Sequence, residues 1–238
     1  MKLNGTSSNT PSDNNLYYDE LIDELGDAHA SAATDTPLRE DAFTLDDATK
    51  IDRIEGHFRE IMEILGLDLT DDSLRGTPRR VAKMFVKETF SGLNPANKPA
   101  PTLFDNKYKY GEMLVEKDIT VHSYCEHHFV PIIGKAHVAY ISSGNVIGLS
   151  KLNRIVQYFA KRPQVQERLT VQIAEELRHA LQTDDVAVII DAKHLCVSTR
   201  GVNDTASSTV TAEYSGKFED EATRQELLRY ISQSSPTI

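Results

Sequence analysis

The spacing of apolar residues changes after a proline-rich segment at residues 94–104, and this change constrains the fold more than any other feature. Before the segment, apolar residues recur every three or four positions over residues 51–65 and 77–92, which predicts two amphipathic helices. After it, residues 113–123 and 129–142 are rich in β-branched and aromatic side chains, which is typical of strands. The chain therefore begins with helices and continues into a sheet.

The second half of the chain contains both patterns. Ser150 is the expected N-cap of a third helix, as Thr77, followed by Pro78, is of the second. The remaining expected elements are helices over 150–162 and 165–181, strands over 186–191, 194–201 and 207–216, and a short helix over 220–232. This order of elements predicts an α+β domain with a largely antiparallel sheet.

Composition and charge exclude several classes of protein. Hydrophobic residues make up 39% and charged residues 26%, which is ordinary for a soluble globular chain. No apolar run has the length of a membrane span and the N-terminus has no secretory signal, so we expect a cytoplasmic protein without a membrane partner. The net charge of −10 argues against nucleic-acid binding. Two cysteines make no disulfide framework, so they are better interpreted as thiols or metal ligands.

Much of the negative charge lies near the N-terminus, where only Lys2 and Arg39 oppose a series of aspartates and glutamates. This region is rich in Ser, Thr and Asn and lacks a sustained apolar period, which predicts a mobile acidic extension. Its piece LYYDELIDEL, residues 16–25, could form a transient amphipathic turn or dock on a partner. The expected organisation is an extension at 1–48 and a domain at 49–235, with a helical part at 49–95 and a part containing the sheet at 110–235.

The stretch HSYCEHHFVP holds the densest group of reactive side chains. Cys125 and His128 are three residues apart and can converge on a turn. A thiolate and an imidazole suit tetrahedral Zn²⁺, and the motif HLC supplies the second thiol. Cys125, His128 and Cys196 would make a site with one open position, as in catalytic zinc sites. His127 and His194 would then stand beside the metal as acid–base candidates.

Other interpretations of these residues compete with a zinc site. Each cysteine or histidine alone is more often a small buried residue or a local hydrogen-bonding group. A nucleophilic dyad of Cys125 with a histidine would leave the HLC motif without a role. The zinc deaminase signature needs a PCxxC pair that this chain lacks. Spacing alone does not decide between zinc and the structural interpretation.

Several long motifs together resemble the GTP cyclohydrolase I family: GTPRRVAKMF, HSYCEHHFVPIIGKAHVAYI, GLSKLNRIVQYFAKRPQVQERLTVQI and HLCVSTRGV. The resemblance runs in order through most of residues 50–235. It implies the tunnelling fold, an antiparallel sheet with helices packed on one face after an N-terminal helical region. It also implies a D5-symmetric homodecamer with active sites between subunits. The implied reaction is hydrolysis of GTP to 7,8-dihydroneopterin triphosphate and formate, the first step of folate or tetrahydrobiopterin synthesis.

The resemblance also implies how the metal site works. One Zn²⁺ per subunit would be bound by Cys125, His128 and Cys196, the same triplet that spacing proposes. His127 and His194 would carry out proton transfers. Fe²⁺ or Mn²⁺ could occupy such a site in some settings, so the metal used in the cell stays open.

Substrate contacts follow from the same resemblance. Glu167 would anchor the guanine edge, because a carboxylate can accept hydrogen bonds from both N1–H and the 2-amino group. Gln166 would be a neighbouring substrate contact. The positions implied for the triphosphate are Arg80, Ser150, Lys151, Arg154 and Arg200.

Two further functions are kept as alternatives. One is another pterin or deazapurine enzyme on the same fold, since one fold hosts several chemistries. The other is a non-enzymatic, zinc-stabilised binding module, which predicts a closed site with four ligands. Turnover separates a module from an enzyme, whereas metal content alone does not.

Overall fold

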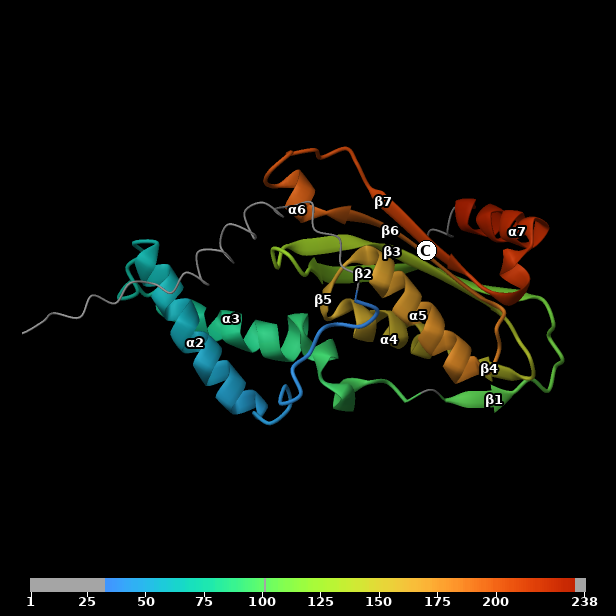
Figure 1. The fold of residues 1–238 in the computed structure, drawn as a ribbon, viewed down its shortest axis with the longest axis horizontal. Coiled ribbons are helices and arrows are strands. Elements are labelled where there is room, and N and C mark those ends of the chain that lie inside the picture. The colour runs from blue at the N-terminus through green and yellow to red at the C-terminus, as the bar shows by residue number, and fades with distance from the viewer. Residues whose placement is uncertain (1–32, 101, 234–238) are drawn as a thin grey trace, which may run out of the picture. The chain divides into compact units, whose positions relative to one another are not determined.

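The structure is a computed structural model that describes residues 33–100 and 102–233 (Figure 1). Most of the acidic extension, including residues 16–25, lies outside the described residues. Two helices form the first part, α2 (Asp47–Ile64) and α3 (Thr77–Met84), as the apolar spacing predicts. Short helical turns then follow at Phe85–Thr89, Ser91–Leu93 and Pro95–Asn97. Within the described residues, no helix is long and apolar enough to cross a membrane.

Local signals and ion pairs fix helices α2 and α3. The Asp46 side chain accepts a backbone N–H of the first turn of α2 at 2.8 Å, and Gly66, at a φ of +80°, follows the end of that helix. Arg79 on α3 forms ion pairs with Asp52 and Glu55 on α2. These pairs connect the two helices, and they give Arg79 a structural role.

A five-stranded sheet forms the second part, with the strand order β5-β2-β3-β6-β7. Its strands are β2 (Met113–Cys125), β3 (Pro131–Ile141), β5 (Pro163–Gln164), β6 (Val186–His194) and β7 (Thr209–Tyr214). All neighbours are antiparallel except β5, which pairs with β2 in parallel. A separate ribbon pairs β1 (Leu103–Asp105) with β4 (Asn145–Ile147). The expected α+β class with a largely antiparallel sheet is confirmed.

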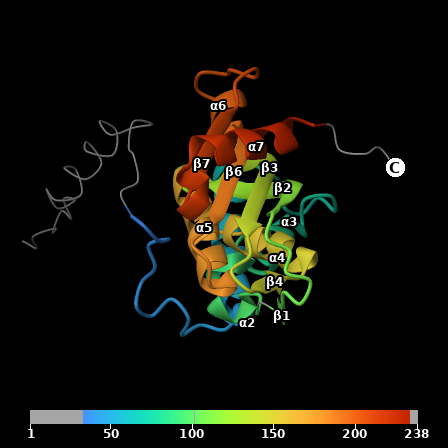
Figure 2. The same cartoon turned by 90° about the vertical axis from the view of Figure 1, so that its right-hand side faces the viewer.

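Helices α4 (Leu149–Ala160) and α5 (Gln166–Leu181) pack on one face of the sheet (Figures 1 and 2). Because side chains alternate along a strand, Val188 of β6 enters this larger core, whereas its neighbour Ile189 faces the other side. There it packs in a smaller cluster with Phe218 and with residues of α7 (Glu221–Ser232). Each fully buried aliphatic or aromatic side chain stabilises the fold by roughly 1.5–3 kcal/mol. The larger core extends to Cys125.

The starts of two helices differ slightly from the sequence predictions. The N-cap of α3 is Gly76, so Thr77 is already helical. The N-cap of α4 is Gly148, so Ser150 lies inside the first turn instead of capping it. Glycine is accepted at N-cap positions, and the Ser and Thr signals displaced the predicted boundaries by one or two residues.

The prediction of a strand over residues 194–201 is wrong. Strand β6 ends at His194, and Leu195–Ser198 form the one-turn helix α6. The β-branched residues of this stretch suggested a strand, but strand preference is easily overridden by packing. Because α6 replaces the expected strand, the residues after β6 turn toward the neighbouring β2–β3 connection, where the candidate site lies.

Candidate active site

The turn between β2 and β3 positions Cys125 and His128. The Cys125 N–H donates to the Val130 carbonyl and the Phe129 N–H donates to the Cys125 carbonyl, both at 2.9 Å. The second bond closes a single helix-like turn, and residues three apart on such a turn lie on the same side. The Cys125 sulfur accordingly lies 3.9 Å from His128 Nδ1.

Cys196 reaches the same point from α6. Strand β6 pairs with β3 so that His194 lies opposite Ile132, at the end of the sheet that carries the β2–β3 turn. The ligand atoms of Cys125, His128 and Cys196 all lie within 4.8 Å of one another. The three residues selected from sequence spacing therefore converge in the structure.

This donor set fits a zinc ion. In a tetrahedral zinc site, zinc–sulfur bonds are about 2.3 Å long and zinc–nitrogen bonds about 2.0 Å, so neighbouring ligand atoms lie about 3.5–3.8 Å apart. The distance between the Cys125 sulfur and His128 Nδ1 is close to this range. Burial, and then the nearby Cys125 thiol, raises the pKa of Cys196 to about 11. Two thiolates this close repel each other, and a divalent cation between them removes that repulsion.

Arg200 contacts the metal-ligand candidate His128. Its Nη1 donates to His128 Nε2 at 2.8 Å, which leaves Nδ1 on the side of Cys125. The guanidinium orients the imidazole ring, but it differs from the usual second partner of a metal-binding histidine, which accepts the ring N–H. With Nε2 accepting from Arg200, the proton of the neutral ring lies on Nδ1, so metal binding at Nδ1 requires the proton to leave that nitrogen and this contact to be released. The role of Arg200 in triphosphate binding stays a prediction.

His194 is held by Gln166 at the start of α5. The Gln166 amide nitrogen faces the carbonyls of Ile190 and Thr209 at 3.1 and 2.8 Å, so its oxygen is the atom 2.8 Å from His194 Nε2. His194 therefore donates from Nε2 and keeps Nδ1 as the basic nitrogen of the neutral ring. Burial lowers the pKa of His194, and the charge of Glu167 partly offsets this effect.

His127 and Glu167 are both exposed candidates. His127 Nδ1 lies 3.5 Å from the Cys125 sulfur, so it stands next to the metal-ligand candidates. Glu167 lies in the first turn of α5, where the partial positive charge of the helix end favours a carboxylate. Both side chains are thus accessible to solvent, and the contact of Glu167 with substrate stays a prediction.

Comparison with known proteins shows which family the chain belongs to. The sequence profile of the family described as GTP cyclohydrolase I matches residues 54–232. A relative from Flavobacterium johnsoniae, named GTP cyclohydrolase 1, is 64% identical over 216 residues, which cover 91% of this chain and 97% of the relative. A second, from Salmonella arizonae, bears the same name and is 54% identical over 206 residues, covering 86% and 93%.

The chain belongs to the GTP cyclohydrolase I family. The resemblance of the motifs is thereby confirmed, and with it the tunnelling fold and the enzyme class. This family is metal-dependent, and the cluster of two cysteines and one histidine is a possible site for its metal.

Of the triphosphate candidates of this GTP cyclohydrolase I chain, Arg200 contacts the cluster, whereas the candidates on α4 do not gather around it. Ser150 and Lys151 lie near the start of α4, whereas Cys125 is bonded to β5, which follows the end of α4. With a rise of 1.5 Å per residue, Lys151 lies about 14 Å along the helix from Ala160, and Arg154, in the middle of α4, lies about 9 Å from it. Figure 1 accordingly shows β4 and α6 at opposite ends of the sheet. Arg80 donates to Ser73 and Thr77 within its own segment.

Sequence reasoning missed two residues that hold the metal-ligand turn. Glu126, inside the CEHH motif, forms an ion pair with Arg168 of α5. Phe129 has a φ of +53°, which is uncommon for a non-glycine residue, and its ring lies 5.0 Å from that of Phe90. Glu126 inside CEHH and Arg168 directly after Glu167 were both visible in the sequence, but no spacing rule connects them.

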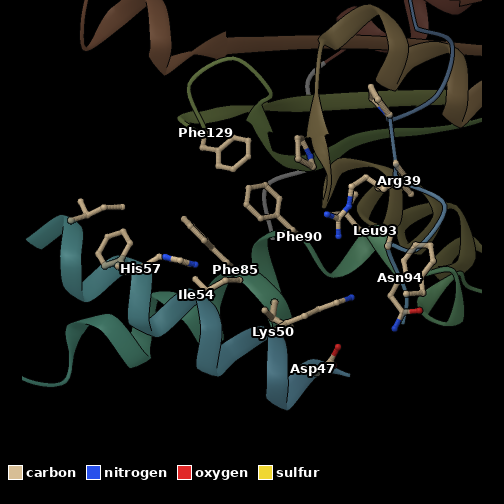
Figure 3. Close-up of a pocket in the computed structure, with 18 residues that line it drawn as sticks. Arg39, Asp47, Lys50, Ile54, His57, Phe85, Phe90, Leu93, Asn94 and Phe129 are labelled. Atoms are coloured by element: carbon tan, nitrogen blue, oxygen red, sulfur yellow. The ribbon is translucent and has the colours of Figure 1, made fainter. Parts of the chain in front are cut away.

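An apolar cavity of about 590 Å³ lies between α2, the turns after α3 and the metal-ligand turn. Figure 3 shows Phe85, Phe90 and Phe129 around it, with Ile54 and His57 contributed by α2. Phe129 is thus the direct link between this helical part and the turn that carries His128. The cavity lacks the cysteines of the cluster, so it is separate from the candidate metal site.

Proposed function

We propose that this chain hydrolyses GTP to 7,8-dihydroneopterin triphosphate and formate with one Zn²⁺ per subunit bound by Cys125, His128 and Cys196. The observation that carries the proposal is the convergence of these three ligands within 4.8 Å in a chain of the GTP cyclohydrolase I family. A zinc ion in a site with three protein ligands keeps one position open and activates water as a Lewis acid.

The chain's own residues would supply proton transfer and recognition. His194, buried and held by Gln166, presents Nδ1 as a proton-accepting atom of fixed orientation. His127 lies on the exposed side of Cys125, where it can reach a bound substrate. The proposed contact of Glu167 is with N1–H and the 2-amino group of guanine, a pair of donors that adenine does not offer.

Gln166 has a more specific proposed role than a general substrate contact. It is buried, its amide nitrogen is directed at backbone carbonyls and Thr211, and its oxygen accepts from His194. These bonds support a function in orienting His194. A direct contact of Gln166 with GTP stays a prediction.

The distribution of the candidates supports a site shared between subunits. Lys151 lies in the first turn of α4, whereas Cys125 pairs with β5, which follows the end of that helix in the same chain. A second subunit that brings its α4 start beside the metal cluster would complete the site, as in the D5 homodecamer expected from the sequence. Cytoplasmic location likewise remains a proposal.

Product analysis tests the proposed reaction. Purified protein loaded with Zn²⁺ should release formate from GTP and form a product with a pterin absorption spectrum, and ATP should give neither. Other pterin and deazapurine precursors serve as competing substrates. Conversion of one of these, without reaction of GTP, would favour the alternative of a different enzyme on this fold. A protein that binds zinc and turns over none of them would favour the binding module.

A further inference from the structure

Glu126 lies between two metal-ligand candidates, and one of its carboxylate oxygens is 3.9 Å from Nε2 of the neighbouring His127. Its carboxylate pairs with the guanidinium of Arg168 on α5, and only 18% of the Glu126 side chain and 3% of the Arg168 side chain are exposed. The Glu126 backbone N–H also donates to the Gln164 carbonyl of β5 at 3.0 Å. Both the backbone and the side chain of this residue are therefore fixed to the elements beside the turn.

Arg168 is too buried to bind substrate, although it directly follows the exposed Glu167. Consecutive helix residues point about 100° apart, so the two side chains leave α5 in different directions. Arg168 Nε donates to the Gln164 side-chain oxygen at 3.0 Å, and a second guanidinium nitrogen approaches the Pro163 carbonyl at 3.3 Å. All of these partners belong to the protein itself.

Gln164 connects this group to the rest of the fold. It is fully buried, and its amide nitrogen donates to the Phe159 carbonyl at 3.0 Å and to the Gln172 side chain at 2.9 Å. Gln172 in turn donates to Asp35, in the segment that precedes α2, at 2.6 Å. The guanidinium of Arg168 is thus anchored by a continuous series of hydrogen bonds, which is buried as far as Gln172 and ends at the exposed Asp35.

A buried ion pair of this kind contributes little net stability, because desolvation of both charges offsets their attraction. Its geometric effect is larger, because one guanidinium joins the turn, β5 and α5 by directional bonds. We propose that Glu126 and Arg168 are positioning residues that hold the β2–β3 turn in the conformation in which Cys125 and His128 bind the metal together. This inference rests on the proposed metal site.

Cobalt binding tests the positioning role with a readout that does not depend on turnover. Co²⁺ bound by two thiolates gives sulfur-to-metal charge-transfer absorption, whose intensity and position report ligand geometry. The test variant is Glu126→Gln/Arg168→Met, which removes both charges together and leaves neither one unpaired in the interior. We expect metal affinity to fall by about 10- to 100-fold, the usual effect of losing groups that support metal ligands, with an altered charge-transfer band.

The matched control is Glu213→Gln/Arg178→Met. Arg178 also lies on α5 and pairs with Glu213 of β7 at 3.5 Å, at the other end of the helix. This variant should bind Co²⁺ as the unaltered protein does. If the first double variant does not fold, Arg168→Lys, which keeps the charge but loses the forked geometry, should show a smaller loss of affinity.

Two results would overturn the inference in different ways. The first result is a folded Glu126→Gln/Arg168→Met variant that binds Co²⁺ with the affinity and spectrum of the parent. This result would exclude the positioning role and leave the metal site intact, and the same holds for Arg168→Lys if it replaces the double variant. Absence of the charge-transfer band in the unaltered protein would show that the metal site itself is wrong, and the positioning role would fall with it.

Discussion

His194 Nε2 lies 2.8 Å from the side-chain oxygen of Gln166, whose amide nitrogen is directed at backbone carbonyls and Thr211. Because α5 packs beside β6 and β7, the Gln166 amide has one orientation, and its oxygen selects the His194 tautomer that carries the proton on Nε2. We expect Gln166→Leu to lower kcat by about 10- to 100-fold, because His194 loses its fixed orientation. Bound zinc should stay at the parent level. Gln157→Leu on α4, which breaks a bond to the Thr120 carbonyl, is the control and should keep parent turnover.

Cys196→Ala and His127→Ala should separate metal binding from proton transfer. Cys196→Ala removes one of three ligands, so metal and turnover should be lost together. His127→Ala should keep its metal and lose about 10²- to 10⁴-fold in kcat, the range for a general acid or base. Metal analysis and GTP turnover of each purified variant give the comparison. Activity in metal-free Cys196→Ala would contradict the zinc mechanism.

Phe129→Ala should destabilise the protein through the aromatic cluster. Its ring is half-exposed and lies near Phe90 and Phe85, so we expect a loss of about 1–2 kcal/mol in free energy of unfolding. Phe129→Gly loses the same ring but accepts the φ of +53° more readily, and should be more stable than the alanine variant by about 1 kcal/mol. Denaturant unfolding measures both, and a glycine variant less stable than alanine would contradict the strain assigned to this position.

The stability of the fold should fall in mild acid because of His137. Its Nδ1 accepts from the Asp118 N–H at 3.2 Å, and burial lowers its pKa from 6.5, an effect that Asp118 and Asp191 oppose and Lys135 and Lys117 reinforce. The unfolded chain therefore binds this proton at a higher pH than the folded chain does. The stability that neutral His137 contributes to the fold is complete above about pH 6.5 and is lost as the pH falls through the lower pKa of His137 in the folded protein.

Thermal unfolding across this pH range tests the role of His137. His137→Asn keeps a hydrogen-bond acceptor for the Asp118 N–H but does not titrate. The melting temperature of this variant should therefore depend less on pH below 6.5 than that of the parent. Equal pH dependence of the two proteins would show that other groups cause the acid sensitivity.

Mixing two inactive variants tests the shared site. Cys125→Ala lacks a metal ligand and Lys151→Ala lacks a triphosphate candidate. Lys151 lies in the first turn of α4, whereas Cys125 pairs with β5, beyond the other end of that helix. If neighbouring subunits complete each other, co-expressed variants should recover up to about a quarter of parental turnover, from sites formed by two intact halves. Each variant expressed alone is the control. Recovery no greater than the sum of the two controls would place both residues in a site formed by one chain.

The fold was largely predictable because its periodic patterns are long. In the apolar stripe predicted for α5, Leu169, Ile173, Leu177 and Leu181 are fully buried, whereas its first member, Val165, is the half-buried N-cap of the helix. Helix α6 was missed because it is a single turn whose sequence resembles a strand. One turn carries too few residues to show a period, so packing decides its conformation.

The candidate site was predictable to the extent that its chemistry depends on scarce residue types. With two cysteines in the chain, the choice of Cys125 and Cys196 as paired ligands was restricted, and the structure brings them together. The pairing of Glu126 with Arg168 could not be predicted, because charged residues are common and this contact depends on where β5 pairs with β2. Tertiary structure decides which partners such common residues have.

Turnover of GTP as a function of bound zinc tests the central claim most directly. Protein stripped of metal is titrated with Zn²⁺, and metal content and dihydroneopterin triphosphate formation are measured on the same samples. The account predicts no turnover without metal and a linear rise that ends at one zinc per subunit, abolished in Cys196→Ala. Full turnover in the stripped protein, or zinc bound at that ratio without any turnover, would contradict it.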